Sequence, residues 1–185
     1  MSKLHSLSIA IVGAGIAGLT AATALARRGA SVTVHERADA LREVGAGLQL
    51  SPNALRVLDA LDLWPRLQAV SVPSERVELR DSSARLVARL DLARYRPKDR
   101  FRLVHRARLL ELLADAARDA GARILLGQDI ATPPQADLVV GADGVKSRMR
   151  PLLNGPEIPF FTGQTAWRAV IPAEPGAQPL SLIHI

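Results

Sequence analysis

The glycine-rich turn GAGIAG at residues 13–18 constrains the fold of this chain more than any other feature. It follows an apolar run at Ser6–Val12, which predicts a strand, and it opens an Ala- and Leu-rich helix predicted over Gly15–Arg28. Gly29 stands where a helix C-cap glycine belongs, and Ser31–His35 predicts a second strand. Strand, glycine turn, helix and strand form the opening βαβ unit of a doubly wound parallel sheet, so the expected fold class is α/β.

Each glycine of the turn has a mechanical role in a dinucleotide-binding fingerprint. Gly13 permits the tight turn out of the strand, Gly15 lets the backbone approach a pyrophosphate, and Gly18 lets the helix pack closely on the sheet. The first helical residues, Ile16 and Ala17, then present unpaired N–H groups and the positive end of the helix dipole to the phosphates.

An acidic residue, Glu36, ends the second strand close to the spacing of about twenty residues that this fingerprint requires. A carboxylate there accepts hydrogen bonds from both hydroxyls of a ribose and repels a 2′-phosphate. The turn and Glu36 together predict that the chain binds the ADP part of FAD or NAD rather than of NADP.

After the second strand, the chain departs from simple alternation of helix and strand. Ala38–Leu50 is a glycine-containing loop, and Val72–Leu92 has near-alternating apolar residues around Asp81-Ser82-Ser83, which predicts a hairpin. The remaining predicted elements are helices at Ser51–Leu63 and Leu103–Ala120 and strands at Arg123–Leu126, Ala136–Val140 and Thr165–Ile171. The stripe of the second of these helices that we expect to be buried is Leu109, Leu110, Leu112, Leu113, Ala116 and Ala117.

Composition narrows the possible functions. The 185 residues carry a formal net charge of +6, but the basic residues are nearly all Arg and are spread along the chain, with 3% aromatics, so no nucleic-acid partner is expected. The apolar fraction of 48% suffices for a core, and the apolar runs are strand-sized, so no membrane partner is expected. The absence of Cys excludes thiolate chemistry, and the four His residues show no metal-ligand spacing. These features suit a cytoplasmic protein without a metal site.

Four stretches carry a family resemblance: IAIVGAGIAGLTAA with VTVHER, VGAGLQLSPNALRVLDALDL, VHRARLLELLADAA, and DLVVGADGVKSRMR with GQTAWRAVIP. In this order they cover nearly all of residues 7–172, and they resemble the N-terminal part of the group A flavoprotein monooxygenases. Within that family the chain is most similar to the branch of salicylate hydroxylase and 3-hydroxybenzoate 6-hydroxylase. The resemblance implies a Rossmann-like FAD-binding sheet, a β-hairpin and the start of a substrate domain.

The resemblance also implies a role for individual residues. Gly13, Gly15 and Gly18 match the ADP-binding fingerprint, and Glu36 matches the ribose ligand. The other matching residues are Arg37 beside the adenosine, Gly45, Ala46 and Gly47 near the isoalloxazine ring, Arg106 at the flavin, and Asp143, Gly144, Ser147 and Arg150 in the family's DG motif, which is associated with both FAD and NAD(P)H. Taken alone, GADG equally fits an ordinary turn, Arg106 a solvated residue, and Gly45 and Gly47 loop hinges.

The implied activity is hydroxylation of a phenolic or benzoate-type aromatic ring. In such a cycle NADH or NADPH reduces FAD, and the reduced flavin reacts with O2 to form a flavin C4a-hydroperoxide that hydroxylates the ring. We name no catalytic residue, because none of the 185 residues is a convincing general base. An NAD-dependent dehydrogenase or reductase and a non-catalytic nucleotide-binding module remain alternatives, and a homodimer stays open.

The resemblance implies that this chain is the first part of a longer protein. The expected FAD-binding domain covers residues 1–156, with the 73–100 hairpin assigned to a substrate domain that re-enters at 157–185. The family's later Gly-Asp motif is not found here, so we expect weak or no FAD retention and no hydroxylation by the chain alone. Residues 180–185, LSLIHI, fit both a natural strand and the translation of a transposon-end adapter, so their origin stays open.

Overall fold

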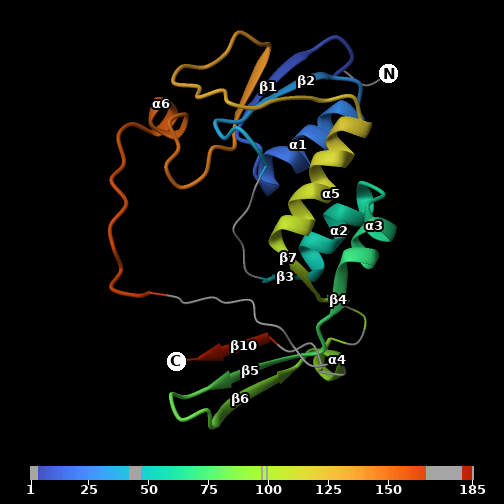
Figure 1. The fold of residues 1–185 in the computed structure, drawn as a ribbon, viewed down its shortest axis with the longest axis vertical. Coiled ribbons are helices and arrows are strands. Elements are labelled where there is room, and N and C mark those ends of the chain that lie inside the picture. Colours follow the sequence, from blue (N-terminus) through green and yellow to red (C-terminus); the bar gives the residue numbers. More distant parts are fainter. Residues whose placement is uncertain (1–3, 42–46, 97, 99, 166–180, 185) are drawn as a thin grey trace. The chain divides into compact units, whose positions relative to one another are not determined.

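The structure is a computed structural model that describes residues 4–41, 47–96, 98, 100–165 and 181–184. The chain divides into two compact units, drawn together in Figure 1. The first consists of Met1–Glu43 and Leu110–Trp167, and the second of Val44–Leu109 and Arg168–Ile185. The domain boundaries expected from the sequence, 1–156 and 157–185, stay a prediction, because compactness alone does not reveal which part binds substrate.

A four-stranded, all-parallel sheet with strand order β8-β2-β1-β9 forms the centre of the first unit. Its strands are β1 (Ser8–Val12), β2 (Ser31–His35), β8 (Arg123–Leu125) and β9 (Leu138–Gly141). Helix α1 (Ile16–Ala26) connects β1 to β2, and α6 (Arg150–Asn154) follows β9 (Figure 1). The predicted α/β class is confirmed.

The core of this unit consists of apolar side chains from the sheet and its helices. Ile9 and Ile11 of β1 and Val34 of β2 are almost fully buried, as is Leu19 of α1. The six residues predicted as the inner stripe of α5 (Arg106–Asp119) are all buried. Burial of one such leucine or isoleucine side chain stabilises the folded state by about 1.5–3 kcal/mol, which explains why the period of the apolar residues located this helix.

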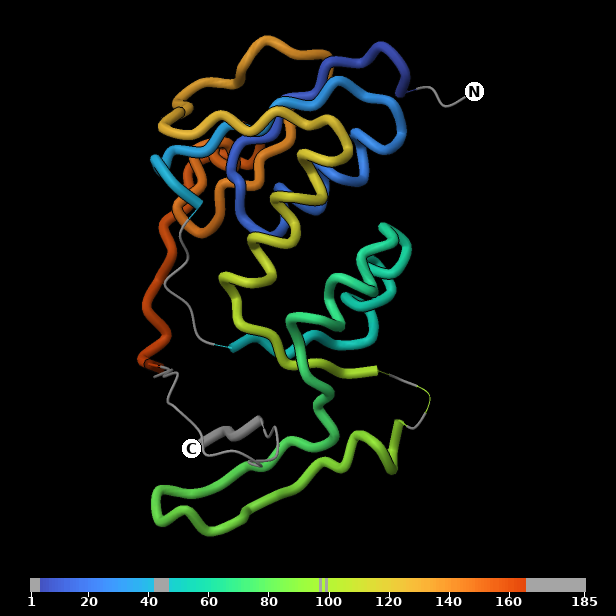
Figure 2. The backbone as a smooth tube through the Cα atoms, turned by 45° about the vertical axis from the view of Figure 1, so that its right-hand side comes forward, coloured from blue at the N-terminus to red at the C-terminus, as the bar shows by residue number. Residues whose placement is uncertain are grey.

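The second unit contains two small three-stranded sheets. Figure 2 follows the backbone of residues 47–96 of this unit as a tube coloured from cyan to yellow-green. In one sheet, β7 (Arg102–His105) is the central strand between β3 (Gly47–Leu50) and β4 (Ser71–Pro73), and both pairings are antiparallel. In the other, the hairpin of β5 (Arg76–Arg80) and β6 (Leu86–Asp91) is extended by β10 (Ser181–His184), which runs parallel to β5. The helices of this unit are α2 (Pro52–Ala60), α3 (Trp64–Val70) and α4 (Leu92–Tyr95).

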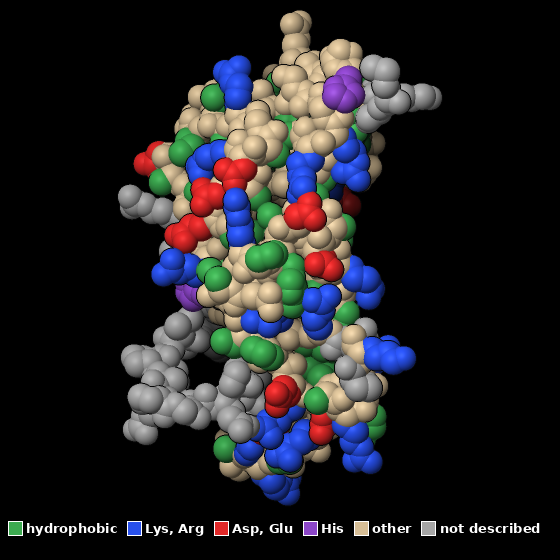
Figure 3. Space-filling model, turned by 90° about the vertical axis from the view of Figure 1, so that its right-hand side faces the viewer, with side chains coloured by type: hydrophobic (Ala, Val, Ile, Leu, Met, Phe, Trp, Pro, Cys, Tyr) green, Lys and Arg blue, Asp and Glu red, His purple; other side chains and the backbone are tan. Residues whose placement is uncertain are grey.

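The predicted hairpin turns at Asp81, whose carboxylate accepts hydrogen bonds from the backbone N–H groups of Ser83 and Arg85, each at 3.0 Å. On the strands, Glu78 is buried and accepts hydrogen bonds from the guanidinium groups of Arg80 and Arg89, each at 2.7 Å. These two hydrogen bonds hold the pKa of Glu78 below its ordinary value despite the burial. On the face drawn in Figure 3, Lys and Arg side chains are likewise interspersed with Asp and Glu side chains.

Two predicted helices differ from the structure. The helix predicted over Ser51–Leu63 ends at Ala60, because Asp62 adopts a φ of +54°, and α3 then begins at Trp64. The first three residues of the helix predicted over Leu103–Ala120 belong instead to β7. They are extended because strands pair with β7 on both sides, and tertiary pairing of this kind overrides local helix propensity.

Smaller differences concern element ends. Strand β1 begins at Ser8 rather than Ser6, and the predicted strand at Thr165–Ile171 lies outside the described residues except for Thr165, which is not in a strand. Within the described part of the chain, no helix is both long and apolar enough to cross a bilayer.

Candidate functional site

Three turns of the first unit lie at one edge of the parallel sheet, because β1, β2 and β9 are neighbours and all end there. The backbone N–H of Gly13 donates to the carbonyl oxygen of His35 at 2.7 Å, and the N–H of Ala142 donates to that of Val12 at 2.8 Å. Strand β1 therefore continues into a turn held on both sides by its neighbours. From β1 the chain continues to β2 on one side, whereas β9 pairs with β1 on the other side. The strand order therefore reverses at β1, and open α/β sheets bind ligands at such a point.

Two of the three fingerprint glycines are required by the fold itself. Gly13 has a φ of +104°, and a Cβ atom there would overlap the carbonyl oxygen of Ala142. A Cβ atom on Gly18 would overlap the carbonyl oxygen of Gly13. The predicted roles of these two residues in the tight turn and in close helix packing therefore correspond to contacts in the structure.

The third glycine differs, because a Cβ atom on Gly15 would meet no described atom within 4 Å. Gly15 is also the N-cap of α1, with a φ of −74° that any residue adopts, so the fold does not require glycine there. The space in front of Gly15 is what the close approach of a pyrophosphate needs.

The N-terminus of α1 has free capacity to bind an anion. As far as the chain is described, no side chain caps this end, and the first turn contains no acidic residue. Ile16 and Ala17 are the first two residues of the helix, so their N–H groups are among those without an intrahelical acceptor. With the partial positive charge of the helix end, these groups and the open face of Gly15 fit a pyrophosphate.

Glu36 is placed beside this turn by its own hydrogen bonds. Its carboxylate accepts the N–H of Ala14 at 2.7 Å through Oε2 and the N–H of Ala38 at 2.9 Å through Oε1. The backbone of Glu36 is fixed as well, since its N–H donates to Leu125 at 2.9 Å. Each carboxylate oxygen retains a second lone pair, so Glu36 can still accept hydrogen bonds from ribose hydroxyls. Arg37, the next residue, is exposed.

The second glycine-containing turn, after β9, uses its polar side chains internally. Asp143 accepts hydrogen bonds from the hydroxyl of Ser147 at 2.6 Å and from the backbone N–H groups of Arg148 at 2.6 Å and Met149 at 3.1 Å. Burial raises the pKa of Asp143, but these three hydrogen bonds together outweigh it and hold the pKa below its ordinary value. Asp143 is therefore a carboxylate whose hydrogen bonds organise its own turn.

Ser147 and Arg150 also bind within this turn. The hydroxyl oxygen of Ser147 accepts the backbone N–H of Arg150 at 2.9 Å. The guanidinium of Arg150 donates to the carbonyl of Val145 at 3.0 Å, and its Nε lies 2.7 Å from Glu157, at an angle that makes an ion pair but not a hydrogen bond. Gly144 has a φ of +78°, which explains the glycine at this position.

The remaining predicted residues belong to the second unit. Gly47 is the first residue of β3 and pairs with His105, so Gly47 and Arg106 lie close together although 59 positions separate them in the sequence. Gly45 and Ala46 lie outside the described residues.

Several groups at the sheet edge were not identified from the sequence. The N–H groups of Ala14 and Ala38 fix Glu36, and the carbonyl of Ala142 restricts Gly13; these are backbone groups, which carry no residue signal. His35, to which we assigned no role, has a buried Nδ1 without a described partner, and burial lowers the pKa of its imidazole. Gly13 directly follows β1 and Glu36 directly follows β2. Because neighbouring parallel strands end at the same edge, these positions could have suggested that the end of β2 contacts the glycine turn.

Fold and site together define a Rossmann-like dinucleotide-binding domain. Comparison with protein families identifies which kind of dinucleotide-binding domain this is. Residues 6–135 match the model of the FAD binding domain, and the chain belongs to this family. Its cofactor is therefore FAD, and the alternative of an NAD-dependent dehydrogenase is not favoured.

Curated relatives extend over nearly the whole chain. It is 33% identical to 6-hydroxynicotinate 3-monooxygenase of Pseudomonas fluorescens, over 91% of this chain and 48% of the relative. It is 38% identical to 3-amino-4-hydroxybenzoate 2-monooxygenase of Streptomyces cremeus (91% and 47%) and 35% identical to 3-hydroxybenzoate 6-hydroxylase 1 of Aquipseudomonas alcaligenes (90% and 48%). The predicted resemblance to FAD-dependent aromatic hydroxylases is confirmed, and the chain spans about half the length of these relatives.

Solved structures agree. The tetrameric form of 2-methyl-3-hydroxypyridine-5-carboxylic acid oxygenase matches with a TM-score of 0.67 and 31% identity, over 79% of this chain and 41% of that one. A complex of CtdE with FAD matches with a TM-score of 0.66 at 21% identity, over 81% and 41%, which shows the shared fold.

Proposed function

We propose that this chain is the FAD-binding part of an NAD(P)H-dependent monooxygenase that hydroxylates a phenolic or benzoate-type aromatic compound. One observation carries the proposal: the uncapped N-terminus of α1, the open face of Gly15 and the fixed carboxylate of Glu36 stand at one sheet edge. Names of the relatives support the reaction, since each describes a monooxygenase or hydroxylase of a hydroxylated aromatic or heteroaromatic acid.

The ADP end of FAD is proposed to bind to the first unit. The N–H groups of Ile16 and Ala17 hold the pyrophosphate, with Gly13, Gly15 and Gly18 giving the backbone its close approach. Glu36 binds the adenosine ribose, and Arg37 lies beside the adenosine. This binding replaces hydration of the anion with fixed N–H donors at a helix terminus.

The flavin end is proposed to bind the Gly45-Ala46-Gly47 segment, Arg106 and the turn after β9. Because Asp143 and Ser147 already bind within that turn, we propose that they act by positioning its backbone and Arg150 rather than by displacing their own partners. A Cβ atom on Gly144 would meet no described atom within 4 Å, so this residue leaves space for a ligand. Bound FAD supplies the activation of O2, and the protein orients the ring and excludes water.

The proposed partners are a small aromatic substrate, O2 and either NADH or NADPH as a transient reductant, with neither a nucleic acid nor a membrane. We propose a cytoplasmic homodimer. Because one related structure is a tetramer, a larger assembly is the alternative. No catalytic residue is assigned, because no described side chain is placed to deprotonate a phenol.

The test uses the full-length protein that contains this chain. We expect it to purify yellow, with flavin absorbance, and to oxidise NADH or NADPH faster when a hydroxylated benzoate is added. Oxygenated product, detected by mass spectrometry with ¹⁸O2, distinguishes hydroxylation from uncoupled oxidation. A colourless protein that binds only a pyridine nucleotide would contradict the proposal, as would flavin-dependent turnover without incorporation of oxygen.

For the 185-residue chain alone, we expect weak or no retention of FAD and no hydroxylation. Exposed apolar side chains of the first unit are consistent with this expectation: Leu153, Ile158, Phe160 and Phe161 are each at least 77% exposed. Dialysis followed by an absorbance spectrum checks the expectation, and a chain that stays yellow would contradict it.

A further inference from the structure

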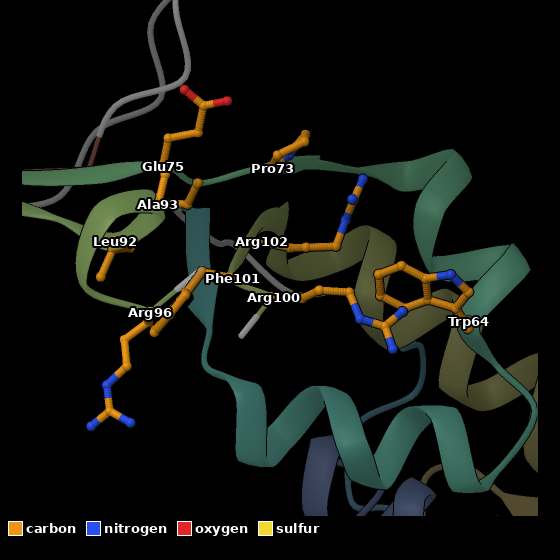
Figure 4. A pocket seen from close by; sticks show the side chains of 10 residues that line it. Trp64, Pro73, Glu75, Leu92, Ala93, Arg96, Arg100, Phe101 and Arg102 are labelled. Atoms are coloured by element: carbon orange, nitrogen blue, oxygen red, sulfur yellow. The ribbon is translucent and has the colours of Figure 1, made fainter. Parts of the chain in front are cut away.

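A pocket of about 340 Å³ lies within the second unit, and it shares no residue with the glycine turns (Figure 4). Its walls are partly apolar, from Trp64, Leu92 and Phe101 among others, and partly cationic, from Arg100 and Arg102. We propose that this pocket binds a small organic monocarboxylate with an apolar body. The inference goes beyond the proposed function and does not depend on it.

The first observation is that two cations meet at one indole ring. The guanidinium carbon of Arg100 lies 4.0 Å from the centre of the Trp64 ring, and that of Arg102 lies 5.5 Å from it. Figure 4 shows the Arg100 side chain extending to the Trp64 ring, whereas the end of the Arg102 side chain turns toward the ribbon that leads to Pro73. The ring attracts each cation, and an anion in contact with either guanidinium would add an opposite charge where these two cations gather.

The second observation is that Arg102 has only neutral partners among the described residues. Its guanidinium donates to the Ser71 hydroxyl at 2.6 Å, to the Ser71 carbonyl and, at 3.5 Å, to the Gln68 carbonyl. Burial lowers the pKa of Arg102, which reflects a cation partly removed from water without a carboxylate in return. These bonds use Nε and Nη2, and the guanidinium that they fix can present Nη1 to an anion with little loss of side-chain entropy.

The local charge favours a monoanion. The charged residues that line the pocket are Arg96, Arg100, Arg102 and Glu75, and Asp59 adds a second carboxylate, whose Oδ2 lies 3.6 Å from Arg100. Three cations less two carboxylates leave a net charge of +1 in this group. A carboxylate neutralises that charge, whereas a phosphate dianion exceeds it.

The apolar walls define the rest of the ligand. Leu92 is buried, and Trp64 and Phe101 are half-buried, so an apolar body placed against them would lose contact with water. Acetate would satisfy the charge without covering the walls, and a neutral alcohol would cover the walls without meeting the charge. The pocket therefore predicts that both parts are needed in one molecule.

The test measures ligand binding through Trp64 fluorescence. The chain contains two Trp residues, so Trp167→Phe leaves Trp64 as the single reporter. We expect cyclohexanecarboxylate, at constant ionic strength and without FAD, to change the emission saturably. Acetate, cyclohexanemethanol and inorganic phosphate should each bind about tenfold or more weakly, because acetate and phosphate lack the apolar body and cyclohexanemethanol lacks the charge.

Variants locate the site. Arg102→Lys retains the charge but loses the fixed Nη1 donor, and Arg100→Gln changes a side chain that is 55% exposed, so the fold should tolerate it. Each should weaken cyclohexanecarboxylate binding about 10- to 100-fold. The matched control is Arg94→Gln, an exposed arginine beside Tyr95 that does not line the pocket and should leave binding unchanged.

Three results would overturn the proposal. The first is a Trp64 signal that does not saturate with cyclohexanecarboxylate. The second is equal binding by Arg100→Gln, Arg94→Gln and the parent chain, provided that far-ultraviolet circular dichroism shows all three folded. The third is phosphate or acetate binding as tightly as cyclohexanecarboxylate, which would indicate a general anion site. None of these results bears on FAD binding, so failure here is distinguishable from failure of the proposed function.

Discussion

The turn after β1 and the turn after β9 follow neighbouring strands of one sheet, but they satisfy their backbone groups in opposite ways. After β9, Asp143 accepts two backbone N–H groups and the Ser147 hydroxyl, so the turn is complete without a ligand. After β1, the end of α1 has no side-chain cap, and Gly15 faces open space.

This difference shows that glycine can be needed in a turn for two physical reasons, one from the fold and one from ligand binding. At Gly13 and Gly18 the protein's own backbone occupies the place of a side chain, so substitution damages the fold. At Gly15 no described atom occupies that place, so a side chain there would compete with a ligand and substitution should damage binding. The following predictions test the distinction between a self-contained turn and a turn that awaits an anion.

The largest effect is expected for Gly18→Ala. The new Cβ atom would overlap the Gly13 carbonyl, and relief requires α1 to move away from the turn, so we expect a loss of about 3 kcal/mol or more in the free energy of unfolding. Denaturant unfolding followed by circular dichroism measures it. Gly15→Ala is the matched control and should change stability by no more than about 0.5 kcal/mol. Equal losses in the two variants would refute the distinction.

The next effect concerns the turn after β9. Asp143→Ala removes the acceptor of three hydrogen bonds, and we expect it to cost about 1–3 kcal/mol of stability. Asp143→Asn keeps one acceptor oxygen and should cost less. Both are measured by denaturant unfolding at pH 7, and a stable Asp143→Ala variant would show that the turn does not depend on its carboxylate.

FAD affinity should respond in the opposite way to stability, because substitution of Gly15 should weaken binding while it leaves the fold intact. In the full-length protein, Gly15→Val fills the space in front of the helix end and should weaken FAD binding about tenfold or more, with little change in stability. Flavin fluorescence during titration of the apoprotein measures the affinity. Retention of normal affinity by Gly15→Val would mean that the pyrophosphate does not approach this residue.

A smaller effect is expected for Glu36→Gln. The amide retains one oxygen to accept a backbone N–H, but it loses the charge that strengthens both bonds, so stability should fall by about 1 kcal/mol. FAD affinity should fall as well, and NADP-type ligands bearing a 2′-phosphate should be rejected less strongly. Titration with FAD and with ADP-ribose 2′-phosphate compares the two; unchanged discrimination would argue against Glu36 as the ribose ligand.

The smallest effect should be a pH dependence from His35. Burial lowers the pKa of this imidazole in the folded chain, so the unfolded chain takes up a proton first as the pH falls below about 6.5. Stability should therefore decrease from pH 7 toward pH 5. The decrease should be smaller in His35→Asn, and urea unfolding at several pH values compares the two chains; parallel curves would exclude His35 as its source.

Much of the first unit was predictable because its signals are local. The glycine turn, the Ala- and Leu-rich composition and Gly29 located α1, apolar periodicity located the inner stripe of α5, and β2 was predicted with its observed bounds. The second unit was predicted less well, since β7 was assigned to a helix and α3 was not expected. A strand of four residues that pairs on both sides owes its conformation to β3 and β4, which are distant in sequence.

The site divides in the same way. Residues of the fingerprint and Glu36 were identifiable because their spacing along the chain reflects the geometry of one βαβ unit. That Asp143 and Ser147 bind each other was not predictable, since the residues of the GADG motif fit both an ordinary turn and a ligand site.

By itself, the amino-acid sequence determined the α/β class, the position of the phosphate-binding turn and the identity of its acidic partner, because each follows from chemistry within about forty consecutive residues. Only the tertiary structure decided which glycines serve the fold and which one faces open space, and which polar groups are already occupied. Those properties depend on atoms of Ala142, Ala14 and Met149, which long-range strand pairing and turn geometry bring to the sheet edge.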